Sequence, residues 1–347
     1  MLRQRRRRTK DVRRQFWIAT RCGMHLGLAA VVVLLLSAES SAQRQQQDPS
    51  DLTRRELREL ERIPFDGREA YQILQEICKI GPRVSGSAGM RKQQELLQKK
   101  FEALGAKVSY QEWTIKHPEN GQDVGLRNMI VEWHPDRPNR VLVCCHYDTR
   151  PYPDQDPVNP FGEFLGANDG ASGAALMCVL GKHMKEIKTF GVDFILFDAE
   201  ELVFDRRRDP MFVGSTYFAE QYARNRPDHE YKFGLLIDMI GDRNLDLYIE
   251  ANSLKFAPEV TKSLFRTAQR LGVREFVART GHEVRDDHLP LNEIARIPTC
   301  DLIDFDYPAP GSNFSYWHTT HDTPDKCSAV SLAKVGWVVT EWLKSCE

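Results

Sequence analysis

The sequence predicts an α/β protein, a three-layer sandwich in which helices flank a central, mixed and mostly parallel β-sheet. Two short runs, residues 140–145 and 192–197, are apolar on both faces, as the central strands of such sheets are. These runs alternate along the chain with segments whose apolar residues recur at helical spacing. Breaks rich in glycine or proline, such as residues 81–87, separate the segments. Strands that alternate with helices favour a sheet covered on both faces.

The predicted elements follow one another from residue 67 to residue 344. Helical periodicity marks residues 67–80, 90–104, 171–185, 213–223, 258–271 and 328–344. Strand patterns mark residues 107–115, 127–133, 140–145, 192–197, 233–237, 245–249 and 299–305. One domain, residues 66–347, accounts for all of them. Long loops interrupt this domain, and functional residues usually lie in such loops.

The composition is ordinary for a globular protein, because 41% of the 347 residues are hydrophobic and 28% are charged. The net charge of -1 conceals a strongly basic N-terminus, MLRQRRRRTKDVRRQFWIATR, ahead of a mildly acidic remainder. That remainder has no basic stripe, so we expect no nucleic-acid partner. The eight cysteines include no C-x-x-C pair, which argues against a zinc site built on thiolates. We expect them to be buried free thiols.

The first 42 residues have the pattern of a secretory signal peptide. A basic stretch precedes the apolar residues 26–38, about 13 residues, which is short of the ~20 that cross a membrane. Small residues precede a cleavage site after Ala42, and the pair Arg13-Arg14 also fits a twin-arginine signal. We expect an exported protein, periplasmic or secreted. The alternative is an uncleaved N-terminal anchor as the only membrane contact. Residues 43–65 are predicted to form a polar linker.

Ionisable residues follow the predicted buried strands, where open α/β sheets bind their ligands. The stretch FDAEEL after one of these strands places two glutamates side by side, which repel each other unless the segment is a solvated loop. The residues found at these strand ends and neighbouring loops are His146, Asp148, Asp169, Glu200, Glu201, Asp238 and His318.

Each of these residues alone has an ordinary explanation. A histidine can simply pack, Asp169 could cap the following helix, and Asp238 could be a turn residue. Together, imidazole and carboxylate groups without thiolates are the ligand set of a catalytic zinc site. If this edge of the sheet faces a cation, one glutamate of the Glu200-Glu201 pair can bind it. The other then acts as a general base, and the cation offsets their repulsion.

These motifs, in this order, resemble the M28 family of zinc peptidases and its close relatives, the glutaminyl-peptide cyclotransferases. The resemblance spans about residues 80–343 and implies the sandwich fold of the zinc aminopeptidases, which is phosphorylase/hydrolase-like. It is carried by His146-x-Asp148, Asn168-Asp169-Gly170-Ala171-Ser172-Gly173, Asp198-Ala199-Glu200-Glu201, Asp238-Met239-Ile240-Gly241 and Trp317-His318-Thr319.

The resemblance also implies the roles of the residues. A zinc ion would be held by Asp169, Glu201 and His318, with Glu200 as the acid and base. In two-metal members of the family, Asp169 bridges to a second zinc, which is also held by the residues matching His146 and Asp238. Asp148 would not bind the metal itself but would orient the ring of His146. We expect one zinc ion and leave the second open.

Two features resemble the cyclotransferases in particular. The segment Arg285-Asp286-Asp287-His288-Leu289-Pro290-Leu291 is similar to their Asp-Asp-His-x-Pro-Phe segment. The resemblance implies that Asp286 hydrogen-bonds with Glu200 and Asp238; the alternative is a helix cap. Trp317 would wall a small substrate pocket, or would simply pack.

Other features resemble the peptidases. Two motifs have the residues that are usual in the peptidases: Asn-Asp-Gly-Ala-Ser-Gly and His-Thr-Thr-His-Asp-Thr. A pocket tryptophan of the cyclases is also missing near Arg206. Residues 206–208 either rim a pocket or only form a solvated loop, and we expect the loop.

We therefore predict a zinc-dependent cyclotransferase that converts the N-terminal glutamine of peptides or proteins to pyroglutamate with release of ammonia. The alternative is a zinc aminopeptidase acting on the same N-termini. A non-enzymatic domain on this fold is a third hypothesis, but such a domain would be expected to have lost Glu200 or a metal ligand, and neither is lost.

Overall fold

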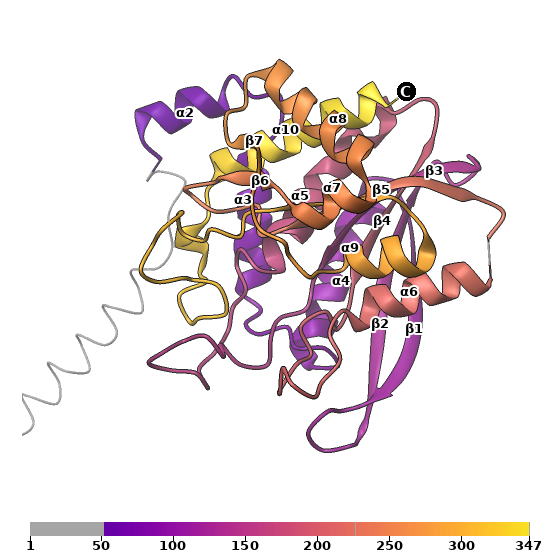
Figure 1. The fold of residues 1–347 in the computed structure, drawn as a ribbon, viewed down its shortest axis with the longest axis vertical. Coiled ribbons are helices and arrows are strands. Elements are labelled where there is room, and N and C mark those ends of the chain that lie inside the picture. The colour runs from indigo at the N-terminus through magenta and orange to yellow at the C-terminus, as the bar shows by residue number, and fades with distance from the viewer. Residues whose placement is uncertain (1–51, 226, 347) are drawn as a thin grey trace, which may run out of the picture. The chain divides into compact units, whose positions relative to one another are not determined.

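A six-stranded sheet in the order β1-β2-β4-β3-β5-β8 forms the centre of the computed structural model, which describes residues 52–225 and 227–346 (Figure 1). Strands β3, β4, β5 and β8 run parallel, whereas β1 and β2 pair antiparallel at one edge. This confirms the predicted mixed, mostly parallel sheet. The strands are β1 (Lys107–Lys116), β2 (Asp123–Trp133), β3 (Asn139–His146), β4 (Gly191–Phe197), β5 (Glu230–Asp238) and β8 (Thr299–Ile303).

Helices cover both faces of this sheet. One layer contains α3 (Gly67–Cys78), α4 (Ala88–Ala103), α5 (Ala171–Leu180), α8 (Pro258–Leu271) and α10 (Ala329–Ser345). The other layer contains α6 (Val213–Arg224), α9 (His288–Pro290) and the π-helical turn η3 (Leu291–Ala295). Val141 and Val143 of β3 belong to the core under the first layer, and Leu142 belongs to the core under the second. Because both faces are covered, β3 is apolar throughout rather than alternating.

Local signals in the sequence explain where several helices begin. The side chain of Asp66 accepts a hydrogen bond from Glu69 N at the start of α3, and that of Ser87 accepts one from Met90 N at the start of α4. Every residue of α5 is buried, in keeping with its run of small and apolar side chains. This buried helix is the one whose N-terminus adjoins the candidate site.

Five elements of the fold differ from the prediction. The helix expected at 171–185 ends at Leu180 and continues as the 3-10 turn η2 (Gly181–Glu186). The strand expected at 245–249 is the shorter β6 (Leu247–Ile249), and it pairs with β7 (Phe276–Thr280) in a separate two-stranded sheet. The helix α7 (Ala251–Phe256) and the elements α9 and β7 were not predicted, because segments this short give little periodicity.

The predicted linker contains a short helix, α2 (Arg54–Leu60), which begins with a capping box formed by Thr53 and Glu56. Leu60 of this helix packs against Ala329 and Val330 of α10. The 3-10 turn η4 (Pro324–Lys326) immediately precedes α10. The N-terminal segment, residues 1–42, lies outside the described residues. Within the described ranges, no helix is long and apolar enough to cross a membrane.

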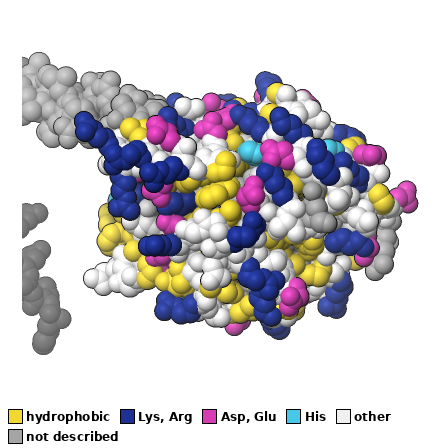
Figure 2. Space-filling model, turned by 90° about the horizontal axis from the view of Figure 1, so that it is seen from above, with side chains coloured by type: hydrophobic (Ala, Val, Ile, Leu, Met, Phe, Trp, Pro, Cys, Tyr) yellow, Lys and Arg dark blue, Asp and Glu magenta, His cyan; other side chains and the backbone are white. Residues whose placement is uncertain are grey.

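The surface is mixed in charge. On the face drawn in Figure 2, acidic and basic side chains are interspersed. The described cysteines are free thiols, and all but Cys346 are buried, as expected from their apolar surroundings in the sequence.

Candidate metal centre

Five ionisable side chains from distant parts of the chain meet at the carboxyl edge of the sheet. All five are buried, none more than 8% exposed. They are His146 at the end of β3, Asp238 at the end of β5, Glu201 in the turn after β4, Asp169 just before α5, and His318 in the loop after β8. Each of these residues was predicted to lie at this edge from its own strand or loop, and the structure shows that their side chains meet there.

Asp169, Glu201 and His318 form the first group that could hold a metal ion. His318 Nε2 lies 2.7 Å from Glu201 Oε1 and 3.4 Å from Asp169 Oδ2. Burial and the charge of Glu201 raise the pKa of Asp169 to about 6, although the two histidines oppose the shift. Burial also opposes the ionisation of Glu201, but His318 and Arg150 outweigh it and bring the pKa of Glu201 to about 2.

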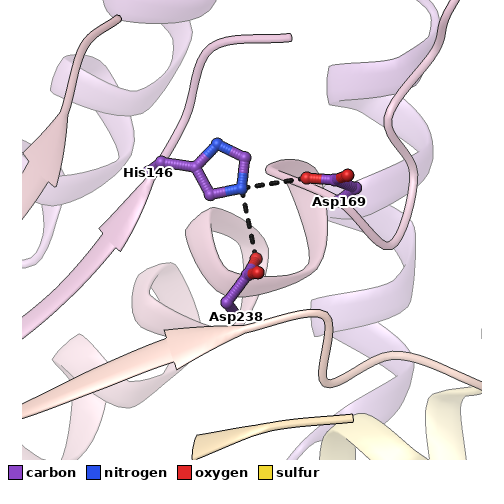
Figure 3. Close-up of side chains that lie close together, drawn as sticks. All are labelled: His146, Asp169 and Asp238. Carbon is purple, nitrogen blue, oxygen red and sulfur yellow. Dashed lines mark hydrogen bonds and ion pairs between the residues drawn. The ribbon is translucent and has the colours of Figure 1, made fainter. Parts of the chain in front are cut away.

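His146, Asp169 and Asp238 form the second group, so the two groups share Asp169 (Figure 3). His146 Nε2 lies 3.1 Å from an oxygen of Asp169 and 3.1 Å from an oxygen of Asp238. The three side chains point toward one another from β3, the start of α5 and the end of β5 (Figure 3). A carboxylate shared by two groups of this kind can bridge two cations.

The first group fits a zinc ion. Its donor atoms are one imidazole nitrogen and two carboxylate oxygens, a combination found in catalytic zinc sites that keep a fourth position open. Asp169 Oδ2 is buried and has no hydrogen-bond partner among the described residues, which would be costly without a cation. A divalent cation would also relieve the repulsion between the carboxylates of Asp169 and Glu201.

Asp148 holds the Glu200-Glu201 turn in place. Its carboxylate accepts hydrogen bonds from Glu200 N at 3.2 Å and from Glu201 N at 3.0 Å. The predicted partner of Asp148, His146 Nδ1, lies 3.7 Å away, which is too long for a hydrogen bond. The structure therefore shows Asp148 beside both groups, with its shortest contacts to the glutamate turn.

Unusual backbone conformations surround the site. Ala199, Met239 and His318 all have positive φ angles, of 59°, 49° and 55°. Ala199 directly precedes Glu200, and Met239 directly follows Asp238. Such conformations are unfavourable for residues with a side chain and tend to be retained at functional sites. Gly170, at φ 94°, follows Asp169, and a Cβ there would lie only 2.7 Å from the carbonyl oxygen of Asp148.

Asp322 is a site residue whose role was not predicted. Its carboxylate accepts hydrogen bonds from Asn168 N at 2.8 Å and Asp169 N at 3.1 Å, and from the hydroxyl of Tyr307 at 2.9 Å. It thereby fixes the backbone that carries Asp169. Helix α5 itself begins without a side-chain cap, so Asp169 does not serve as one. The only signal in the sequence was the position of Asp322 four residues after His318.

Asp154 and Arg150 were also missed. Asp154 Oδ1 lies 3.2 Å from His318 Nδ1 and accepts a hydrogen bond from Arg150 Nε at 2.9 Å. Arg150 N in turn donates to Glu201 Oε2 at 2.9 Å. When His318 Nε2 holds a cation, its Nδ1 carries the proton of the ring, and Asp154 is then the neighbour that can accept this hydrogen bond and orient the imidazole, because the guanidinium of Arg206 near the same nitrogen can only donate. Both residues lie in or next to the proline-rich loop, whose path has no periodic signal.

The expectation that residues 206–208 form only a solvated loop is wrong for Arg206. Arg206 Nε pairs with Asp154 Oδ2 at 2.8 Å, and its Nη2 lies 2.7 Å from His318 Nδ1. Its guanidinium also lies over the ring of Trp317, 5.0 Å from the ring centre. The prediction failed because the partners of Arg206 come from segments about 50 and 110 residues away in the sequence.

Glu200 is partly exposed beside these groups. Burial raises the pKa of Glu200 well above its ordinary value, and the charges of Glu201 and Asp286 raise it further, against the opposing effect of His146. A carboxyl with a raised pKa can both accept and return a proton near neutral pH. These are the properties of a general acid and base.

Asp286 and Asp287 are buried next to this carboxyl. Burial raises the pKa of Asp286 well above its ordinary value, and the charge of Asp238 is the next largest cause. Asp286 Oδ1 accepts a hydrogen bond from Asp287 N at 2.6 Å. Within the described residues, Asp286 makes no direct hydrogen bond to Glu200 or Asp238. Asp287 is the N-cap residue just before α9, but its side chain makes no capping hydrogen bond there; it accepts a hydrogen bond from the hydroxyl of Ser215 instead.

Trp317 forms one wall beside the first group. Its ring stacks on that of His318, with ring centres 3.9 Å apart, and meets Phe305 edge-on at 5.2 Å. The side chain is neither fully buried nor fully exposed. Trp317 therefore packs and also presents an aromatic surface next to the candidate ligands.

Peptidase family M28 matches residues 128–343 of the chain. The protein belongs to this family. A solved structure of Fimbriiglobus ruber glutaminyl cyclase is 40% identical, with a TM-score of 0.76, over 81% of this chain and 95% of that chain. A leucine aminopeptidase precursor from Bacteroides thetaiotaomicron is 31% identical, with a TM-score of 0.73, over 81% of this chain and 97% of that chain.

The curated relatives of this M28 protein include both activities. Aminopeptidase YwaD of Bacillus subtilis is 26% identical over 78% of this chain, which spans only about half of that protein's length (54%). The glutaminyl-peptide cyclotransferase of Gloydius blomhoffii is 24% identical over 73% of this chain and 75% of its own. The comparisons confirm the family, the fold class and the resemblance to cyclases.

Proposed function

We propose that this M28 protein is a zinc-dependent glutaminyl-peptide cyclotransferase, which closes the N-terminal glutamine of peptides to pyroglutamate and releases ammonia. The observation that carries the proposal is the 40% identity with a glutaminyl cyclase over 81% of this chain and 95% of that chain. The aromatic wall at Trp317 and the carboxyls of Glu200 and Asp286 beside the metal ligands support it. The cofactor proposed is one zinc ion on Asp169, Glu201 and His318.

When bound there, zinc supplies positive charge that polarises the side-chain amide of the substrate. The chain itself supplies the proton transfers. The α-amine of the substrate forms a bond to the side-chain amide carbon, and the bond from that carbon to the amide nitrogen breaks. Glu200 takes the proton that the attacking amine loses and returns it to the departing nitrogen, which leaves as ammonia. Protons therefore balance over one turnover.

The neighbouring residues would position these groups. Asp148 holds the amides of Glu200 and Glu201, so it fixes the base relative to the ligand that follows it. The charges of Glu201 and Asp286 favour the protonated form of Glu200. Asp238 acts in the same way on Asp286, and we expect Asp286 and Asp238 to hold this network in place. Trp317 would cover one side of the substrate's glutamine and exclude water from the amide.

An aminopeptidase is the second candidate, and one observation favours it. His146 Nε2 lies 3.1 Å from an oxygen of Asp238 and 3.1 Å from an oxygen of Asp169, which also belongs to the first group. Ligands for a second cation are therefore available. Two cations serve to activate water in aminopeptidases. With water in place of the α-amine as nucleophile, the same Glu200 would be the base for peptide hydrolysis.

We also propose a role for each region of the chain. Residues 66–347 would be the catalytic domain and residues 43–65 its linker. Residues 1–42 would be a signal peptide or N-terminal anchor, which would place the enzyme outside the cytoplasm.

Ammonia release separates the two activities. Purified, zinc-loaded protein is incubated with Gln-Phe-Ala and, in parallel, with Leu-Phe-Ala, and both ammonia and free amino acids are measured. A cyclase releases ammonia from the first peptide only and leaves the second intact. Free leucine or free glutamine without ammonia would refute the cyclase and support the aminopeptidase. The Glu200→Gln protein serves as the control for contaminating activities.

A further inference from the structure

A further buried group of ionisable side chains, separate from the two candidate metal groups, lies beside the turn that carries Asp286. It consists of Glu250, which precedes α7, His288 in α9, and Asp301 in β8, and none of the three is more than 2% exposed. His288 Nε2 lies 3.5 Å from Glu250 Oε2, and His288 Nδ1 lies 3.6 Å from Asp301 Oδ2. The imidazole is thus placed between two carboxyl groups that come from different elements. We call these three residues the buried triad.

The contacts of His288 with the two carboxyl groups are longer than hydrogen bonds. Neither ring nitrogen of His288 and neither carboxyl oxygen of Asp301 has a hydrogen-bond partner among the described residues. The imidazole therefore fixes the separation of the two carboxyl groups by packing between them at ion-pair distance. Burial raises the pKa of Asp301 well above its ordinary value, and the charges of Asp286 and Glu250 raise it further.

The carboxylate of Glu250 contacts residues on both sides of Asp286 in the sequence. Its Oε1 accepts hydrogen bonds from Val284 N at 2.9 Å and from Asn252 N at 2.8 Å. Its Oε2 faces His288. Val284 lies two residues before Asp286 and His288 two residues after it, so one carboxylate holds both ends of the turn that carries Asp286.

Asp301 connects the same turn to the central sheet. It pairs in register with Leu236 of β5, two residues before Asp238. The backbone N–H of Asp301 donates a hydrogen bond to Ser253 Oγ at 2.8 Å, and that hydroxyl donates to Glu250 Oε2 at 2.8 Å. The buried triad and Ser253 therefore form a closed ring of contacts joining β8, α7 and the Asp286 turn.

We propose that His288 is a positioning residue, which links Glu250 to Asp301 and thereby fixes the carboxyl of Asp286 next to Glu200. This inference rests on the proposed function, because the effect is transmitted to Glu200 as the acid and base. Within the described residues, the hydrogen bonds and ion pairs of the buried triad do not reach a candidate metal ligand. Loss of the buried triad should therefore affect the chemical step more than the binding of substrate or zinc, since a misplaced acid–base network lowers kcat.

The test compares zinc-loaded His288→Gln with wild type and with a matched control, His282→Gln. His282 is an exposed histidine that pairs with Asp306 at 2.9 Å. We expect His288→Gln to lower kcat by about 10- to 100-fold, with KM and zinc content within about twofold of wild type, and the control to leave all three unchanged. An unchanged kcat in folded His288→Gln, or a proportional loss of bound zinc, would overturn the proposal; the second result would make His288 a metal ligand.

The conservative variant Asp301→Asn separates positioning from mere stability. Its side chain has the same size and can make the same contact with His288 Nδ1, so kcat should stay within about threefold of wild type. A loss as large as that of His288→Gln would overturn the proposal. If His288→Gln does not fold, the 15N NMR spectrum of the wild type decides. The ring of His288 should be shielded from solvent and show slow proton exchange, and a freely exchanging ring would refute the buried triad.

The proposed function and this inference fail in different ways. If wild type releases glutamine rather than ammonia, the cyclase is refuted. The ratio of kcat between His288→Gln and wild type is then measured with that product and still tests His288.

Discussion

The replacement Glu250→Gln tests whether a buried carboxylate holds the Asp286 turn. The wild-type side chain is ionised and accepts hydrogen bonds from backbone amides of Asn252 and Val284 and from Ser253. Burial opposes its ionisation, but His288 and these amides outweigh burial and lower the pKa of Glu250 from 4.5 to about 2. A shift of this size corresponds to about 3 kcal/mol of folding stability at pH 7.

The lowered pKa of Glu250 also predicts how its contribution to folding stability changes with pH. Because the pKa of Glu250 is lower in the folded protein, the stabilisation is fully present above pH 4.5 and is lost as pH falls toward 2. Urea unfolding of metal-free wild type and Glu250→Gln should differ by about 3 kcal/mol at pH 7 and by about 2 kcal/mol at pH 3.5. A difference below about 1 kcal/mol at pH 7, within the range of an ordinary surface substitution, would refute the reasoning. So would a difference that grows on acidification.

Three further replacements test the candidate site. Glu200→Gln should lower kcat by at least about 100-fold and keep its zinc, because it removes only the proton carrier; full turnover would exclude Glu200 as the base. His318→Ala should lose zinc on dialysis, as measured by elemental analysis, because one of three ligands is gone; stoichiometric metal would contradict its role. Asp154→Asn should weaken zinc binding by about 10- to 100-fold in competition with a chelator, because His318 loses its orienting partner; an unchanged affinity would contradict that contact.

The central strands and the ligand set could be predicted from the sequence because one physical rule connects them. Parallel strands end at the same edge of a sheet, so His146, Asp238 and the glutamate pair had to lie near one another once their strands were recognised. Asp169 and His318 belong to loops beside these strand ends, so the same rule pointed to their edge of the sheet, and the family resemblance added their roles as metal ligands. The structure supports that placement through the 2.7 Å contact between His318 and Glu201.

The residues that support the ligands could not be predicted in the same way. Asp154, Arg206 and Asp322 act through hydrogen bonds between loops, and the path of a loop has no hydrophobic period to reveal it. Asp301 was the one buried partner with a visible signal, since it is a charged residue inside an otherwise apolar strand pattern. Burial of such a group is costly without a neighbour of matching charge, and the imidazole of His288 lies at ion-pair distance, 3.6 Å away.

The most direct test of the central proposal is mass spectrometry of Gln-Phe-Ala after incubation with the purified, zinc-loaded protein. The proposed cyclotransferase predicts an intact peptide lighter by about 17 Da, the mass of the ammonia lost when the side-chain amide is displaced. The appearance of Phe-Ala together with free glutamine would contradict it and would make this M28 protein an aminopeptidase.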